Sequence, residues 1–331
     1  MSNTSLPSIF NNFNSINALI IGDVMIDSYI WGSVERMSPE APVPIVRVDK
    51  RDFRLGGAAN VALNIQALGA TPIICAVVGH DDEGNRFIER LGERDISSDG
   101  IVLSDERPTT VKTRVISDNQ HMVRIDEESD AEITTKETIS LKEKIKSLII
   151  KCQVVIFEDY DKGSISPEII TYTVNLAKQH NIPTVVDPKK RNFMDYHGVT
   201  LFKPNLKELK EGLHVEFDVT DQEQLEEAVN TLLKHLSCDS ALITLSEHGV
   251  YVCNQESRHH FAAHIREIAD VSGAGDTVIS IAALCVALGL SYDLVAQLSN
   301  LGGGLVCEHV GVVTINKQLL LEEAQQTISN F

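Results

Sequence analysis

Residues 268–277 read Ile-Ala-Asp-Val-Ser-Gly-Ala-Gly-Asp-Thr and lead directly into the apolar run 278–290. Gly273 and Gly275 allow the backbone to turn tightly where a helix can begin, so several N–H groups converge there. Because the helix dipole also favours negative charge at this point, the turn predicts an anion cradle that includes Ala274. Short glycine-rich matches are common by chance, so an ordinary glycine turn remains the alternative.

Asp276 is the unusual residue of this stretch. A carboxylate beside an anion cradle repels a bound phosphoryl group unless it takes the proton of an attacking hydroxyl. That is what a base does in phosphoryl transfer. The alternative is an acidic residue in a first helical turn that only complements the helix dipole.

The composition limits the classes of protein to which the chain can belong. It has 331 residues, 43% of them apolar, and a net charge of −18. The chain can therefore bury a large core, and its charge opposes binding to nucleic acid or to an anionic membrane. Six scattered cysteines without CxxC spacing predict reduced core residues in a cytoplasmic protein. The N-terminus lacks the pattern of a signal peptide, and the longest apolar run is too short to span a bilayer.

Short β-branched runs alternate with longer helical patterns, which predicts an α/β fold with helices on both faces of a mostly parallel sheet. The expected strands are 18–21, 71–78, 154–157, 184–186, 200–202 and 241–244. The expected helices are 58–68, 86–91, 136–150, 167–180, 222–236, 278–288, 292–307 and 317–329.

Two segments fall outside this alternation. Residues 43–48 form a short extended run, and 110–125 read as a hairpin that turns at 118–120. In the first arm of the hairpin, Lys112 and Arg114 share one face, which is therefore basic. In so acidic a chain, a small sheet with a basic face predicts a lid over an anionic ligand. A solvated edge strand that carries lysine against aggregation is the alternative.

Polar residues follow five of the expected strands. The carboxyl ends of parallel strands lie along one edge of a sheet, and ligands of open α/β folds bind outside that edge. We therefore expect these polar clusters and the glycine turn to form one cleft. The clusters begin at Gly22, Glu158, Asp187, Lys203 and Thr244.

Residue chemistry suggests a sugar-binding side of this cleft. Asp23 and Asp27 can accept hydrogen bonds from several hydroxyl groups, although a solvated turn would look the same. Gly57 opens a helix next to Asn60, so a ligand can approach the backbone there, but tight helix packing also needs small residues.

Other polar residues of the predicted cleft are suited to bind phosphate groups and a metal ion. Lys162, Lys189 and Arg191 would each pair with a phosphate on the substrate, unless they are ordinary surface charges. Asn205 and Glu208 can hold Mg²⁺, mainly through its water molecules. The alternative for this pair is a helix N-cap with Glu208 at the N3 position.

Motifs of competing classes are missing from the sequence. It has no GxxxxGK[ST] loop, no GxGxxG after the first strand and no GxSxG. A P-loop NTPase, a Rossmann dehydrogenase and an α/β-hydrolase are therefore disfavoured.

The segments 56–60 and 270–277 resemble the two signatures of the ribokinase-like (PfkB) carbohydrate kinases. Within that family, other segments resemble the D-glycero-β-D-manno-heptose 7-phosphate kinases: 22–27, 38–44, 112–115 and 205–208. The resemblance extends from about 17 to about 313. It implies one ribokinase-like domain over 1–331, a three-layer α/β/α fold, and a small β-sheet lid formed mainly by 41–50 and 108–126.

The resemblance also implies an activity, the ATP-dependent phosphorylation of the C1 hydroxyl of the heptose 7-phosphate on the route to ADP-heptose and lipopolysaccharide. Asp276 would be the base, with Gly273, Ala274 and Gly275 as its anion hole. The implied ATP side comprises Asn205, Glu208, Thr244, Ser246, Gly249 and Asn300, with Mg²⁺ near the first two. The sugar side comprises Asp23, Asp27, Gly57 and Asn60. The expected contacts of the 7-phosphate are Lys112, Arg114, Lys162, Lys189 and Arg191.

Further expectations follow from the same resemblance. Such lids commonly pair between subunits, which implies a homodimer, and whether a monovalent cation sits near Asp270 stays open. Ser246 replaces a glycine usual in the family's TxGxxG loop, and Ser272 stands where threonine is commoner. No HxGH motif is present, so we expect the nucleotidyltransferase activity of bifunctional relatives to reside on another polypeptide.

Two other functions remain open at this stage. One is a kinase of the same fold that acts on ribose, a fructose phosphate or a nucleoside, although Lys189 and Arg191 favour a phosphorylated sugar. The other is a non-catalytic sugar-phosphate sensor, against which the presence of Asp276, Asn205 and Glu208 argues.

Overall fold

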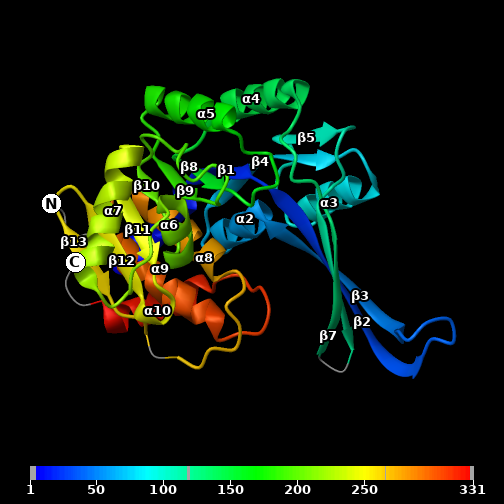
Figure 1. The fold of residues 1–331 in the computed structure, drawn as a ribbon. Helices are drawn as coiled ribbons and strands as arrows, with labels where there is room; N and C mark the ends of the chain where they lie inside the picture. The colour runs from blue at the N-terminus through cyan, green and yellow to red at the C-terminus, as the bar shows by residue number, and fades with distance from the viewer. Residues whose placement is uncertain (1–4, 118–119, 265, 329–331) are drawn as a thin grey trace.

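The computed structural model describes residues 5–117, 120–264 and 266–328. Over these residues, nine strands form a large, mostly parallel sheet between two layers of helices, and four strands form a small sheet that projects from one side (Figure 1). The large sheet has, in spatial order, β13 (Arg258–Phe261), β12 (Val250–Asn254), β11 (Ser240–Thr244), β10 (Leu201–Phe202), β9 (Thr184–Asp187), β8 (Val154–Glu158), β1 (Asn17–Gly22), β4 (Thr71–Gly79) and β5 (Ile101–Ser104). In the large sheet, the pairs β11–β12 and β12–β13 are antiparallel, and the other described pairs are parallel.

Alternate side chains of the central strands belong to two separate hydrophobic cores, one on each face of the large sheet. In β1, Ala18 and Ile20 pack on one face of the sheet, and Leu19 and Ile21 pack on the other. The first face is covered by α1 (Leu6–Asn12), α2 (Ala58–Ala67), α3 (Asp82–Gly92), α8 (Ala274–Ala287), α9 (Tyr292–Cys307) and α10 (Lys317–Thr327). The second is covered by α4 (Thr135–Ile149), α5 (Pro167–Gln179), α6 (Leu206–Leu213) and α7 (Gln222–Leu236). Because both faces are buried, the central strands carry mainly apolar side chains up to their carboxyl ends.

The structure confirms the α/β class and each expected strand. The expected helix 86–91 is the middle of a longer one, because the Asp81 side chain caps α3 by accepting a hydrogen bond from Gly84 N at 2.7 Å. The sequence analysis missed α1, α6, β5, β12 and β13, which are short. All six cysteines are buried and unpaired. Of the helices in the described ranges, none has the length and apolar character needed to cross a membrane.

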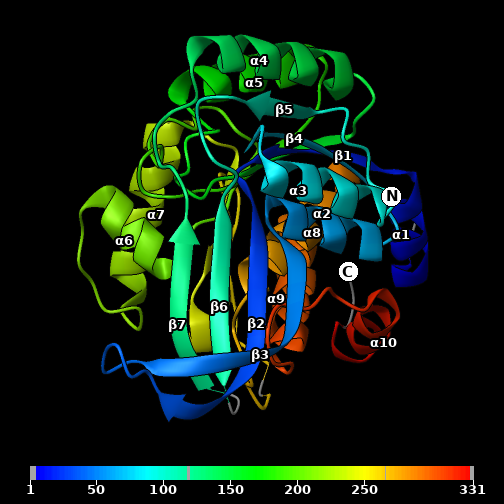
Figure 2. The same cartoon turned by 90° about the vertical axis from the view of Figure 1, so that its right-hand side faces the viewer.

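The small sheet has the order β3 (Pro44–Gly57), β2 (Val24–Met37), β6 (Val111–Ser117) and β7 (Gln120–Glu127), and β2, β6 and β7 run side by side in Figure 2. The hairpin expected at 110–125 is present as β6 and β7, but the turn expected at 118–119 lies outside the described residues. Segment 43–48 begins the longer β3. The polar cluster that begins at Gly22 lies in an extended segment and not in a turn, because the chain continues as β2, which was not among the expected strands, after the single residue Asp23.

Gly57 joins the small sheet to α2 in a conformation that only glycine adopts readily. Its φ is 60° and its ψ is −137°, and it precedes the first helical residue. A Cβ atom at this position would lie 2.4 Å from the carbonyl oxygen of Asp23. The backbone of β3 can therefore approach β1 closely and turn into α2.

We expect Gly57→Ala to lower the free energy of unfolding by at least about 2 kcal/mol, because it combines backbone strain with a steric clash. Urea unfolding followed by circular dichroism measures this change. Gly92→Ala is the matched control, since no atom lies within 4 Å of a Cβ placed there and Gly92 ends a helix. Equal stability of the two variants would contradict the assignment of strain to Gly57.

Candidate active site

The predicted cleft is formed by the carboxyl ends of five adjacent parallel strands, β11, β10, β9, β8 and β1. Helix α8 begins at this edge. Its N-cap, Gly273, has a φ of 80°, and Ala274, Gly275 and Asp276 form its first turn. A Cβ atom on Gly275 would lie 3.6 Å from the Asp187 carboxylate and 4.0 Å from Lys203 Nζ, both ordinary contact distances, so the turn lies beside these two charged groups. Gly273, Ala274 and Gly275 are partly exposed, and the Ala274 amide donates a hydrogen bond to the Val271 carbonyl oxygen at 3.3 Å. The start of a helix favours a bound anion.

The Asp276 carboxylate is buried and held at both oxygens. Asn60 Nδ2 donates a hydrogen bond to Oδ2 at 2.5 Å, and the Tyr160 hydroxyl donates one to Oδ1 at 2.9 Å. Burial raises the pKa of Asp276 from 3.8 to about 6, and the Asp187 charge adds to the rise, while the two hydrogen bonds and Lys203 oppose it. The group is therefore ionised at neutral pH and still able to accept a proton.

Other buried charges surround Asp276. Lys203 Nζ lies 2.9 Å from Asp187, and both side chains are almost fully buried. Neither oxygen of Glu158 has a hydrogen-bond partner among the described residues. Burial, together with the charges of Asp187 and Asp276, raises the pKa of Glu158 well above its usual range. The sequence analysis assigned no role to Glu158, Lys203 or Tyr160, although each lies in one of its strand-end clusters.

Asn205 and Glu208 form a capping box at the start of α6, the structural alternative considered for this pair. Asn205 Oδ1 accepts a hydrogen bond from Glu208 N at 2.8 Å, and Glu208 Oε2 accepts one from Asn205 N at 2.9 Å. The other oxygen, Glu208 Oε1, lies 2.6 Å from Lys189 Nζ. Asp187 Oδ1, 3.9 Å from the same ammonium group, has no hydrogen-bond partner in the described part of the chain. Both oxygens of Glu208 are therefore engaged, and the described residues contain no group of three or more acidic, histidine or cysteine side chains that could hold a metal ion directly.

The loop after β11 carries the remaining residues predicted for the nucleotide. Ser246 has a φ of 53°, a left-handed conformation that glycine adopts more readily, which explains why glycine is usual there. Gly249 closes the turn by accepting a hydrogen bond from Leu245 N at 2.7 Å. Thr244 pairs with Asn205 in an isolated β-bridge. Asn300 lies on α9 and donates a hydrogen bond to the Ala262 carbonyl oxygen at 2.8 Å.

The residues predicted for the sugar lie in two different settings. Asp23 is buried, and its oxygens accept hydrogen bonds from the backbone amides of Tyr160, Lys162 and Ser164 at 2.9–3.0 Å. Asp23 therefore orders the loop after β8. Asp27 and Asn60 instead line an open hollow of about 490 Å³ between β3, α2 and α3.

The five basic residues predicted to contact the 7-phosphate do not all lie together in the structure. Lys112 Nζ and Lys162 Nζ meet at the Glu128 carboxylate, at 2.7 and 2.8 Å. Arg114 pairs with Asp27. Lys189 lies apart, beside Glu208, and Asp187 and Glu208 raise its pKa although burial alone lowers it. Arg191 Nη1 donates a hydrogen bond to the Asp130 carbonyl oxygen at 2.6 Å.

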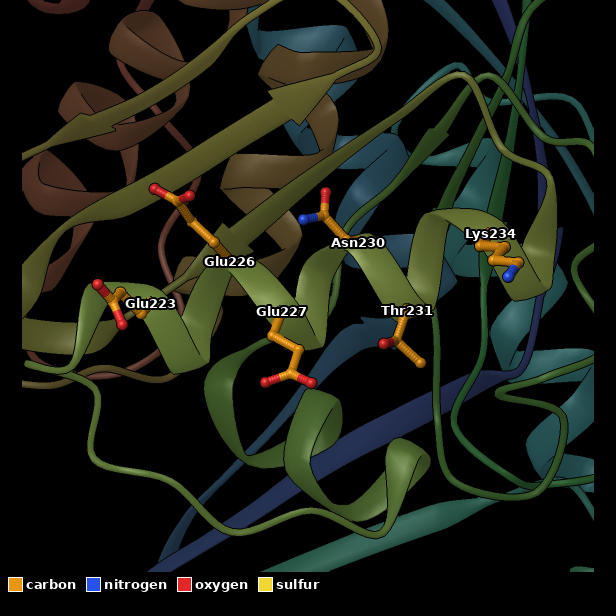
Figure 3. A pocket seen from close by; sticks show the side chains of 6 residues that line it. All are labelled: Glu223, Glu226, Glu227, Asn230, Thr231 and Lys234. Carbon is orange, nitrogen blue, oxygen red and sulfur yellow. The ribbon is translucent and has the colours of Figure 1, made fainter.

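A second hollow, of about 400 Å³, lies along the outer surface of α7 (Figure 3). Its lining residues are Glu223, Glu226, Glu227, Asn230, Thr231 and Lys234. None of the predicted site residues belongs to this hollow, and acidic side chains dominate it. It therefore offers no place for a phosphorylated substrate.

A model of the pfkB family of carbohydrate kinases matches residues 16–319. The chain belongs to this family. It is thus a phosphotransferase with an alcohol group as acceptor, and the resemblance stated from the sequence is confirmed. The bifunctional protein HldE of Pelobacter propionicus is 37% identical over 316 residues, which cover 95% of this chain and 64% of that protein. The HldE of Syntrophotalea carbinolica is 35% identical, with 97% and 66% covered.

Solved structures show the same pfkB-type fold. Phosphofructokinase-2 of Escherichia coli, as its Y23D mutant, superimposes with a TM-score of 0.76 at 16% identity, over 94% of this chain and 99% of that one. Ribokinase of Arabidopsis thaliana, complexed with ribose and ATP, gives a TM-score of 0.71 at 16% identity, over 93% and 99%. The chain spans about two thirds of the length of the HldE relatives.

The raised pKa of Asp276 predicts that Asp276→Asn stabilises the fold at neutral pH. The pKa of this carboxyl is 3.8 in the unfolded chain and about 6 in the folded protein. The folded state therefore loses stability as the pH rises between these two values. Removing the charge should raise the free energy of unfolding at pH 7 by at most about 3 kcal/mol. Urea unfolding of both proteins between pH 4 and pH 8 measures the gain, which should shrink toward pH 4. A gain independent of pH would contradict the raised pKa.

Proposed function

We propose that this kinase transfers the γ-phosphoryl group of ATP to the C1 hydroxyl of D-glycero-β-D-manno-heptose 7-phosphate. The product would be the 1,7-bisphosphate, made in the cytoplasm on the route to ADP-heptose and the lipopolysaccharide core. The observation that carries the proposal is the buried Asp276 carboxylate in the first turn of α8, beside a glycine-rich helix start. The choice of sugar rests on the resemblance to the heptose kinases and on the HldE relatives.

In the proposed mechanism Asp276 accepts the proton of the C1 hydroxyl as that oxygen attacks phosphorus. A hydroxyl is far less acidic than a carboxyl, so the proton moves during or after the attack. The amides of Gly273, Ala274 and Gly275 stabilise the negative charge on the transferred group. Mg²⁺, when bound, neutralises charge on the phosphates. Asn205 and Glu208 would hold it through water, and Thr244, Ser246, Gly249 and Asn300 would contact the nucleotide.

The 7-phosphate has a plausible binding place at Lys112 and Lys162. These two ammonium groups come from the small sheet and from the loop after β8, and they share the Glu128 carboxylate. A phosphate carries more negative charge than a carboxylate and can take its place between them. In this proposal the chain is one kinase domain, and the small sheet acts as its lid over the sugar.

The acceptor is tested by incubating the purified protein with ATP, Mg²⁺ and a panel of sugars while ADP release is measured. We expect the heptose 7-phosphate to give the highest kcat/KM, above ribose, fructose 6-phosphate and nucleosides. A general base contributes about 10²–10⁴-fold, so Asp276→Asn should lose at least about two decades of kcat. A preference for another sugar would contradict the proposed acceptor, and near-normal turnover by the variant would remove Asp276 from its role. Binding without turnover by the wild type would indicate a sensor.

We also propose that two copies pair through the small sheet. Strand β7 is an edge strand, and Val123 and Ile125 are 51% and 50% exposed on the face opposite Lys112 and Arg114. An exposed apolar edge strand is unfavourable in an isolated molecule, and a second copy would cover it.

If the small sheets pair, Ile125→Asp should convert the dimer to a monomer, because the new charge would be buried against the partner. Light scattering coupled to size exclusion measures the mass. Ile150→Asp is the control, since Ile150 is 62% exposed and lies at the end of α4, far from the small sheet along the chain. A wild-type monomer, or an unchanged dimer in the Ile125 variant, would contradict this interface.

A further inference from the structure

Tyr160 touches the carboxylate on which the proposed chemistry depends, yet no sequence motif marks it. Its hydroxyl donates a hydrogen bond to Asp276 Oδ1 at 2.9 Å, while Asn60 holds the opposite oxygen, Oδ2. The two donors come from different parts of the fold, the loop after β8 and the first turn of α2. Together they fix the plane of the carboxyl group as well as its position.

The position of Tyr160 is itself set by buried groups. Asp23 Oδ2 accepts hydrogen bonds from Tyr160 N at 3.0 Å and from Lys162 N at 2.9 Å. Asp23 Oδ1 accepts one from Ser164 N at 3.0 Å. Asp23 is 1% exposed, so these bonds are shielded from water and the loop has little freedom. The phenol is therefore placed before any ligand arrives.

The Tyr160 hydroxyl can act only as a donor in this setting. Burial and the charges of Asp276, Glu158 and Asp187 raise the pKa of Tyr160 well above its usual range. It therefore keeps its proton and does not compete with Asp276 as a base. The ammonium group of Lys189, 5.5 Å from the ring centroid, contacts the ring as a cation–π partner.

We propose that Tyr160 is a positioning residue that orients the Asp276 carboxylate for proton transfer from the acceptor hydroxyl. This inference rests on the proposed role of Asp276 as the base and adds the residue that controls it. Asp23 acts one step further away, because it holds the backbone of Tyr160 and shares no hydrogen bond with Asp276.

Several other charged groups near Asp276 influence its pKa, and a test based on pH must take them into account. The charge of Asp187 raises the pKa of Asp276 and that of Lys203 lowers it, while Glu158 and Asp276 repel each other. Tyr160→Phe changes none of these charges and leaves the Asn60 hydrogen bond in place. Its effect on the titration of Asp276 therefore reports the lost hydroxyl alone.

The test compares Tyr160→Phe with Tyr196→Phe, which removes a similar hydrogen bond, 2.8 Å long, from Tyr196 to the buried Asp159, which precedes Tyr160 in the chain and shares no hydrogen bond with Asp276. The Asp276 carboxyl is followed by ¹³C NMR, and its signal is identified by its absence in Asp276→Asn. We expect Tyr160→Phe to move this titration, and the acid limb of the kcat profile, upward by about one pH unit, because a donor to the charged form is lost. The kcat at pH 7 should fall at least about twofold, because about half of the Asp276 carboxyl groups would then be protonated, with little change in KM, whereas Tyr196→Phe should change neither.

An unchanged titration together with an unchanged kcat in Tyr160→Phe would overturn the inference. If that variant does not fold, 3-fluorotyrosine at position 160 keeps the shape and makes the hydroxyl a stronger donor, so the titration should move downward. No shift there would overturn the inference as well. Failure of the wild type on every sugar would contradict the proposed function, while the titration alone would still decide whether Tyr160 controls Asp276.

Discussion

Burial of like charges at one edge of a parallel sheet is the constraint on which this site depends. Glu158 ends β8, Asp187 ends β9 and Asp276 begins α8, and all three carboxyl groups are buried. Loss of water and repulsion by neighbouring carboxylates favour the protonated forms of Glu158 and Asp276. Lys203, with two neutral donors on Asp276, offsets part of this cost. The proton affinity of Asp276 is therefore higher than that of an ordinary aspartate.

The small sheet is joined to this edge by covalent and ionic connections. A single residue, Asp23, separates β1 of the large sheet from β2 of the small one. The Glu128 carboxylate then ties Lys112 of β6 to Lys162 of the cleft loop. The small sheet therefore has a fixed base and a set of charges that a bound anion can rearrange. This combination suits the lid proposed above.

The sequence was most informative where one pattern has one structural solution. Apolar β-branched runs predicted each central strand, and the glycine turn predicted the start of α8, because parallel strands and tight helix starts allow few other residues. The strand β2 was missed because a polar cluster after a buried strand looks like a loop. The roles of Tyr160, Glu158 and Lys203 depend on side chains that meet across distant segments, and spacing along the chain carries no signal for that. The residue types of Asn205 and Glu208 are compatible both with a helix cap and with a cation site. Their spacing could not decide between the two, and the structure shows the capping box.

The three amide contacts of Asp23 have a consequence for how the molecule acquires its site. The residues they join, 23 and 160–164, are about as far apart in the chain as an average domain is long, and all four strands of the small sheet lie between them. Closing so long a segment is entropically costly and slow, so these contacts belong late in the folding reaction. During synthesis, the loop after β8 can therefore become ordered only after the whole of β1 to β8 has emerged.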